Sequence, residues 1–220
     1  MDVDNYGLEG SAAWVVEKNI ETKRVLLNKK EDALKDKWQV RVHVPGEHMI
    51  LNAMAAVAVG RALGLTIDEM TRGIAEAGTI GGRSDIIHTG KLTIIDDCYN
   101  ANPVSMKAAV ELLETAKTRK VAILGDMFEL GEDEKKLHHE VGSFITQKNI
   151  DVVVCIGNLA EEIYLAAKEG NAQCHHYSSK AKMMEQASQL FKEEDTILLK
   201  ASHGMSFSEL VSFCSSHTFL

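Results

Sequence analysis

Residues 94 to 103 read Ile-Ile-Asp-Asp-Cys-Tyr-Asn-Ala-Asn-Pro, a short apolar run followed by a polar segment and a proline. The apolar run begins at Leu92 and is typical of a strand buried on both faces. Asn102 and Pro103 suit the start of a helix, because asparagine accepts a hydrogen bond from a free N–H there and proline lacks the donor that would be unpaired. The stretch therefore predicts a strand, a polar turn and a helix.

This polar turn is the first candidate site. Ligands of open α/β sheets bind at the carboxyl ends of the strands, and Asp96, Asp97, Tyr99 and Asn100 follow such an end. The alternative, that these side chains only cap and solvate a turn, stays open on the residues alone.

From Ser84 onward, strands and helices alternate. Strands are expected near 85–88, 92–95, 121–124, 152–156, 175–177 and 196–199, and helices over 103–118, 132–148, 159–169, 180–192 and 206–213. This order predicts an α/β fold, a Rossmann-like, mostly parallel sheet with helices on both faces. Polar groups recur after its strands, at Asp96-Asp97, Gly125-Asp126, Gly157-Asn158 and Lys200 with Ser202-His203. We expect them to share one edge of the sheet, although Asp126 is equally well explained as the polar end of a strand.

The first 44 residues are expected to form β structure, with strand-like runs over 12–16, 24–27 and 38–44 before the break at Pro45-Gly46. A helix from about 47 to 63 is apolar almost all round, which predicts burial on most sides. His48 and Asn52 are its polar exceptions on one face, and they bind either neighbouring backbone or a ligand. The next helix begins with Thr66 and Glu69 in the spacing of a capping box.

The segment Gly78-Thr79-Ile80-Gly81-Gly82 predicts a hinge between two domains, 1–80 and 81–220. Arg83 follows it, so the hinge would bring a guanidinium near the domain junction, where a ligand is held from both sides. The alternative is a solvated arginine in a loop.

The composition argues against several classes of function. Lys and Arg number 24 against 32 Asp and Glu, a net charge of -8, which argues against a broad nucleic-acid surface. We find no apolar run long enough to cross a bilayer and no signal-peptide pattern, so we expect a cytoplasmic protein with no membrane partner. The four cysteines are widely spaced and are expected to be free thiols.

Several motifs are missing. The sequence has no G-x-x-x-x-G-K-[ST] phosphate loop and no G-x-G-x-x-G after a strand. The adjacent pairs His138-His139 and His175-His176 diverge on a helix or a strand, so we predict no metal site there.

Four stretches together resemble the Mur ligases. They are residues 46–56 (GEHMILNAMAA), Gly82-Arg83, residues 95–109 (IDDCYNANPVSMKAA) and residues 124–132 (LGDMFELGE). The resemblance runs from about residue 8 to the end of the chain. It implies the last part of a central ATPase domain followed by a whole C-terminal Rossmann-like domain, with the N-terminal domains of the same polypeptide as missing partners.

The resemblance also implies an activity in peptidoglycan precursor synthesis. Using ATP and Mg²⁺, a full-length ligase of the branch that these motifs favour would phosphorylate the peptide carboxylate of UDP-MurNAc-tripeptide, and the amine of D-Ala-D-Ala would attack the acyl phosphate. The 220-residue chain alone is expected to be inactive, because it lacks the phosphate loop.

Carried over by position, four residues would bind the nucleotide: His48, Asn52, Arg83 and Asp97. Four more would bind the substrate in the cleft that holds the nucleotide and the amine substrate: Tyr99, Asn100, Asn102 and Asp126. Asn102 is also explained as a helix cap alone. The sequence departs from the family at Met49, where a second asparagine is frequent, and at Ala201-Ser202-His203, where Gly-Ser-Arg is usual, so His203 is expected to be a weaker anion contact.

Two other functions stay open. The chain is alternatively a non-catalytic α/β module that binds a nucleotide or a partner protein, or part of a related ligase of the folylpolyglutamate or cyanophycin type.

Overall fold

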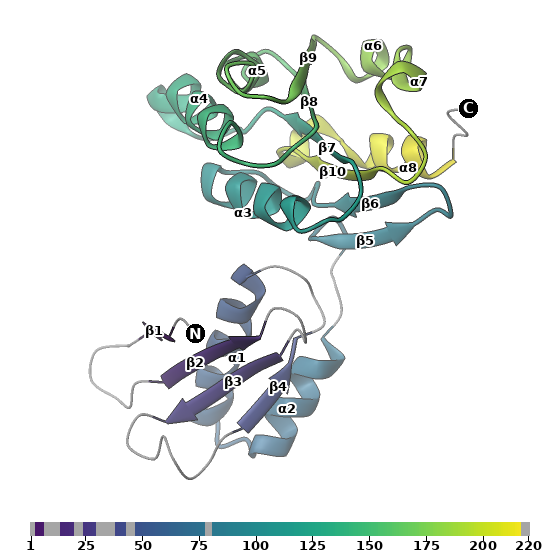
Figure 1. Ribbon diagram of the computed structural model, residues 1–220. Helices are drawn as coiled ribbons and strands as arrows, with labels where there is room; N and C mark the ends of the chain where they lie inside the picture. Colours follow the sequence, from purple (N-terminus) through teal and green to yellow (C-terminus); the bar gives the residue numbers. More distant parts are fainter. Residues whose placement is uncertain are drawn as a thin grey trace. The chain divides into compact units, whose positions relative to one another are not determined.

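A computed structural model describes residues 3–6, 14–19, 24–29, 38–42, 47–77 and 81–216, with side chains described for Val42 and from Met49 onward. The chain divides into two compact units, Met1–Gly78 and Thr79–Leu220 (Figure 1). The predicted break at Pro45-Gly46 and residues 78–80 of the predicted hinge lie outside the described residues.

The first unit combines an antiparallel sheet with two helices. Its strands are β1 (Val3–Tyr6), β2 (Trp14–Asn19), β3 (Arg24–Lys29) and β4 (Trp38–Arg41), paired in that order. The helices are α1 (Glu47–Ala62) and α2 (Ile67–Glu76), and α2 packs beside β4 and α1. The strands predicted from residue 12 onward are confirmed in kind, and β1 precedes them.

The start of α2 follows the predicted capping box. The Thr66 hydroxyl accepts from the Glu69 N–H at 3.3 Å, and the Glu69 carboxylate accepts from the Thr66 N–H at 2.8 Å. Two free helix donors are thereby satisfied by local side chains, which is why this boundary was predictable from sequence.

The predicted burial of α1 on most sides is wrong for this structure. Val57 is buried at 3%, but Leu51 and Val59 expose 42% and 59% of their surface. Among the described residues, Met70 and Ile74 of α2 and Val42 form the apolar cluster with one side of α1. An apolar helix sequence indicates that the helix is buried, but it does not indicate which segment of the chain packs against each face.

The second unit is built on a six-stranded sheet (Figure 1). Its strands are β5 (Asp85–His88), β6 (Thr93–Asp96), β7 (Lys120–Gly125), β8 (Val152–Ile156), β9 (Gln173–Tyr177) and β10 (Thr196–Lys200). The order across the sheet is β5-β6-β10-β7-β8-β9, with β5 antiparallel to β6 and the other pairs parallel. The predicted α/β class and mostly parallel sheet are confirmed.

Helices cover both faces of this sheet. One face packs against α3 (Pro103–Glu114), α4 (Glu134–Ile145) and α5 (Ala160–Ala167), and the other against α6 (Lys180–Met184), α7 (Ala187–Leu190) and α8 (Ser208–Ser216). Short 3-10 turns, η1 (Gly131–Asp133) and η2 (His203–Met205), lead into α4 and α8. The helix predicted over 180–192 is two short helices, and the one over 103–118 ends at Glu114. In the described part of the chain, no helix combines the length and apolarity that crossing a bilayer requires.

His175, in the edge strand β9, makes stability depend on pH. Its Nε2 atom is buried without a hydrogen-bond partner among the described residues, and burial lowers the pKa of the ring below its ordinary 6.5. Just below pH 6.5 the unfolded chain therefore binds more protons than the folded chain. The stability that the neutral His175 ring contributes is present above pH 6.5 and is lost as the pH falls. We expect the melting temperature of the wild type to fall more steeply than that of His175→Phe between about pH 7 and about pH 5. Parallel slopes in a thermal melting series would contradict this.

Candidate functional site

The carboxyl ends of three neighbouring strands place their loops side by side. In the parallel register, Leu199 of β10 lies opposite Asp96 of β6, and Lys200 lies opposite Leu124 of β7. The loop after β10 is therefore flanked by the loops after β6 and β7. The predicted common edge of polar strand ends is confirmed for these three strands.

Lys200 fixes the acidic turn after β6. Its side chain is only 2% exposed, and its Nζ donates to Asp97 Oδ2 at 2.6 Å and to the Asn100 carbonyl at 2.9 Å. The other carboxylate oxygen of Asp97 accepts from the Ser84 N–H at 2.9 Å. A buried ammonium needs such partners, because an unpaired charge in the interior is costly. Asp97 is thus held between the last strand and the segment that carries Arg83.

Arg83 lies on an exposed aromatic ring. The guanidinium carbon is 4.0 Å from the centroid of the Tyr99 ring, and Tyr99 is 45% exposed. The centroids of the Tyr99 and His203 rings are 6.0 Å apart, and the two ring planes form an angle of 50°. Gly82 makes this approach possible: its φ is +77°, and a Cβ there would lie 3.1 Å from the Tyr99 nitrogen. The structure therefore brings the predicted Arg83, Asp97 and Tyr99 together, with the guanidinium on an aromatic face.

Two other predicted residues, Asn100 and Asp126, form hydrogen bonds within the second unit. The Asn100 side chain accepts from the Ala101 N–H at 2.8 Å, and its carbonyl holds Lys200. The Asp126 side chain accepts from the Ala160 N–H at 2.7 Å, at the first residue of α5, and Asp126 is only 7% exposed. For Asp126 this geometry supports the structural alternative, a carboxylate at a helix N-terminus.

Asn102 caps α3, as its sequence position predicted. Its side-chain oxygen accepts from the Ser105 N–H at 2.8 Å, and its own N–H donates to the Ser105 hydroxyl at 3.1 Å. We expect Asn102→Ala to lower the free energy of unfolding by about 1 kcal/mol, while Asn102→Ser, which retains a capping oxygen, costs only a few tenths. Urea unfolding of both variants tests this, and equal losses would show that the cap is not what the side chain supplies.

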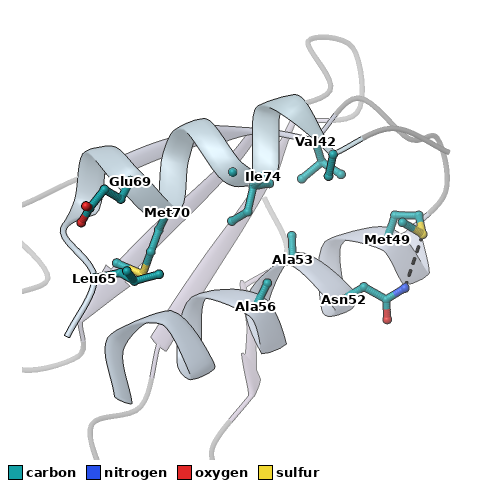
Figure 2. A pocket seen from close by; sticks show the side chains of 11 residues that line it. Val42, Met49, Asn52, Ala53, Ala56, Leu65, Glu69, Met70 and Ile74 are labelled. Carbon is teal, nitrogen blue, oxygen red and sulfur yellow. Dashed lines mark hydrogen bonds between the residues drawn. The ribbon is translucent and has the colours of Figure 1, made fainter. Parts of the chain in front are cut away.

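The two remaining predicted residues belong to the first unit. Asn52 is exposed and lines a pocket of about 310 Å³ between α1 and α2. Figure 2 shows Asn52 and Met49 at one end of this pocket and Leu65, Glu69 and Met70 at the other. The Asn52 amide donates to the Met49 sulfur at 3.4 Å, a weak acceptor. His48 lies in α1, but its side chain is outside the described ones.

The edge combines a charged group, an aromatic ring and buried hydrogen-bonding groups. Burial, and next the nearby Asp96 carboxylate, raise the pKa of Cys98 far above the ordinary thiol value, so this cysteine stays a protonated donor to the Leu199 carbonyl. Among the described residues, no group of three or more His, Cys, Asp or Glu side chains is arranged to hold a metal ion. What the edge offers is a guanidinium, an aromatic face and fixed carbonyl and carboxylate oxygens.

Sequence reasoning gave no site role to Ser84 or Phe128, and it named Ser202 only as part of a polar strand end. Ser84 is 3% exposed with φ at +51° and donates its N–H to Asp97. Ser202 is also 3% exposed, and its hydroxyl accepts from the Phe128 N–H at 2.8 Å. Phe128 itself is 41% exposed. The available signal for Phe128 was an aromatic residue between Asp126 and Glu129, just after the predicted strand. The backbone conformation of Ser84 leaves no signal in the sequence.

Comparison with known proteins places this edge in a family. Residues 82–203 match the family model described as "Mur ligase, glutamate ligase domain". The chain is 36% identical over 175 residues to the UDP-N-acetylmuramoyl-tripeptide--D-alanyl-D-alanine ligase of Bacillus subtilis (strain 168), covering 77% of this chain and 38% of that protein. The chain therefore spans about two fifths of that relative's length.

Two solved structures share the fold. A crystal structure of MurF from Acinetobacter baumannii matches with a TM-score of 0.80 and 27% identity, covering 92% of this chain and 44% of that one. MurF ligase from Thermotoga maritima in complex with ADP matches with a TM-score of 0.71 and 23% identity, covering 97% and 45%. At that lower identity the second likeness shows the fold alone.

Proposed function

Because the chain belongs to the Mur ligase family, we propose that it is the C-terminal portion of an ATP-dependent ligase that joins D-Ala-D-Ala to UDP-MurNAc-tripeptide. The family consists of ligases that form amide bonds at the expense of ATP, and the substrate pair is proposed from the Bacillus subtilis relative, whose name states the joining of a tripeptide precursor to D-alanyl-D-alanine. The proposed setting is the cytoplasm, in the synthesis of peptidoglycan precursors.

The proposed reaction has two steps. The terminal phosphoryl group of ATP passes to the substrate carboxylate, which makes a good leaving group of a poor one and releases ADP. The dipeptide amine then attacks the acyl carbon, and the tetrahedral intermediate collapses with loss of inorganic phosphate. Among the described residues, no group of three or more His, Cys, Asp or Glu side chains is arranged to hold a metal ion, and the second unit is proposed to act by binding its ligands.

One observation carries the proposal: the Asp97 carboxylate is held by Lys200 and the Ser84 N–H, directly beside Arg83 and Tyr99. Arg83 offers a cation for phosphate, the Tyr99 ring a face for a base, and the turn fixed oxygens for hydroxyl or amine donors. In this proposal Arg83 and Asp97 contact the nucleotide, Tyr99, Asn100 and Asn102 face the cleft, and the described edge supplies binding and orientation. His48 and Asn52 remain proposed contacts on the first unit.

Calorimetry on the 220-residue chain tests this proposal. We expect saturable binding of ADP and of D-Ala-D-Ala, with ADP binding about tenfold weaker in Arg83→Met, because a charge-assisted contact to phosphate is lost. The matched control is Arg72→Met, an exposed arginine of α2 in the first unit, which should leave both affinities unchanged. Silence toward both ligands would favour a non-catalytic module, and binding of ADP with a different amine substrate would favour another ligase branch.

Ligation by the isolated chain is expected to be absent. Its 220 residues hold no G-x-x-x-x-G-K-[ST] segment, and that segment supplies the amides and the lysine that hold the transferred phosphate. Phosphate release and product formation with all three substrates measure this. ATP-dependent joining of D-Ala-D-Ala by the chain alone would contradict the proposed division of labour.

A further inference from the structure

The loop after β7 carries an exposed aromatic side chain, and buried side chains form hydrogen bonds with the backbone of this loop. Phe128 is 41% exposed, yet its N–H donates to Ser202 Oγ at 2.8 Å, and the N–H of Met127 donates to His138 Nε2 at 2.8 Å. Ser202 and His138 are 3% and 0% exposed. The position of the Phe128 backbone is therefore set by two side chains of the core, one from the end of β10 and one from α4.

Those anchors leave His138 no role in chemistry. Its Nε2 accepts from Met127, so the ring proton is on Nδ1, which donates to the Glu134 carbonyl at 2.6 Å. Directly after Phe128, Glu129 has φ at +63°, a left-handed conformation that costs a residue other than glycine about 1 kcal/mol. Strain of this kind, next to an apolar ring held in solvent, points to a binding role for the ring.

Phe128 continues the row of exposed side chains described above. A Cβ placed on Gly204 would lie 3.2 Å from Phe128 Cε2, so the ring lies against the segment that begins with His203. The His203 ring lies beside the Tyr99 ring, and the Arg83 guanidinium lies over the Tyr99 ring. We call Arg83, Tyr99, His203 and Phe128 the aromatic strip. It has a guanidinium at one end and an apolar ring at the other.

We propose that Phe128 recognises the methyl side chains of the dipeptide amine substrate and thereby determines its specificity. The inference rests on the proposed function. D-Ala-D-Ala has a carboxylate and two methyl groups, and the aromatic strip offers a guanidinium and an exposed ring on one rigid edge. Burying a methyl group against the Phe128 ring is favourable, so the ring should favour D-Ala-D-Ala over glycylglycine. The charged ends of these two dipeptides are the same.

The test compares two dipeptides that differ only in those methyl groups. Calorimetric titration of the 220-residue chain should show D-Ala-D-Ala bound about tenfold more tightly than glycylglycine. In Phe128→Ala this ratio should fall toward one through weaker binding of D-Ala-D-Ala, with the affinity for glycylglycine unchanged. Phe128→Leu, which retains an apolar side chain, should keep most of the preference.

A matched control removes another exposed apolar side chain of the same unit. Leu165 in the last turns of α5 is 36% exposed, and Leu165→Ala should leave the ratio at its wild-type value. Melting temperatures verify that each variant is folded. A ratio unchanged in Phe128→Ala, or equal weakening of both dipeptides, overturns the role of Phe128 and leaves the proposed function standing. Failure of the wild type to bind D-Ala-D-Ala at all overturns the proposed function and this inference with it.

Discussion

Replacing Lys200 by methionine is expected to lower the free energy of unfolding of the second unit by about 3–5 kcal/mol. The Lys200 side chain is 2% exposed and that of Asp97 is 14% exposed, and their charged atoms are 2.6 Å apart. Methionine fills the space of the lysine stem but leaves the Asp97 carboxylate and the Asn100 carbonyl without their shared donor. The loss of a partner for a buried charge is the costly event, more than the loss of the pair itself.

The double variant Lys200→Met/Asp97→Asn separates these two effects. With both charges removed, we expect part of the lost stability to return, so the two substitutions should be strongly non-additive. Lys91→Met is the control, because Lys91 pairs with Glu193 at 3.2 Å where both side chains are about half exposed; such a pair is worth at most about 1 kcal/mol.

Amide hydrogen exchange of β6 and β10 in urea is the suitable measurement. Both tryptophans, Trp14 and Trp38, belong to the first unit and do not report on the second. The expected structural signature in Lys200→Met is faster exchange in the turn 97–100 than in the rest of the unit. A loss no larger than that of Lys91→Met would show that Lys200 does not hold this turn.

Replacing Gly142 by alanine is expected to destabilise the same unit by about 3 kcal/mol or more. Gly142 lies in α4 where that helix meets α5, and a Cβ there would be 2.3 Å from the Ile163 carbonyl oxygen and 2.7 Å from the Ala166 Cβ. The obstacle is helix backbone, which cannot rotate away as a long side chain does. The two helices would have to separate, and the apolar contacts between them would be lost.

Gly73→Ala is the matched substitution in the other unit. Gly73 also lies inside a helix, α2, but a Cβ there would meet no atom within 4 Å. Without a clash, the better helix propensity of alanine should stabilise α2 by about 0.5–1 kcal/mol. Opposite signs for the two Gly→Ala changes, followed by hydrogen exchange of each helix, are the expected result. If both changes stabilised their helices, the close approach of α4 and α5 would be refuted.

Local signals predicted a large part of the fold. The alternation of apolar strands and amphipathic helices predicted the α/β class, and capping residues predicted the starts of α2 and α3, because these depend on neighbours a few residues away. Polar residues after strand ends predicted a shared edge. Arg83, Asp97 and Tyr99 were singled out from their place beside the predicted hinge and the first polar turn, and in the structure they lie together.

Other features depend on partners that are distant in the sequence or unknown. Hydrophobicity alone predicted that α1 is buried on most sides, yet Leu51 and Val59 are exposed. Asp126 was predicted as a substrate contact or as the polar end of a strand, and its carboxylate accepts a hydrogen bond at the N-terminus of α5, 34 residues away. Phe128 was given no role from sequence, because the side chains that bind the backbone at Phe128 and Met127, Ser202 and His138, are distant in the sequence.

The sequence by itself determined the kinds of elements in this protein, their order along the chain and the polar residues at the strand ends, because these follow from side-chain periodicity and local hydrogen bonding. Only the tertiary structure decided that the last strand, β10, lies between β6 and β7. That position brings Lys200 to Asp97 across 103 residues and Ser202 to Phe128 across 74. Strand order is set by how the whole sheet buries its two faces, and no local pattern along the chain encodes which strand becomes whose neighbour.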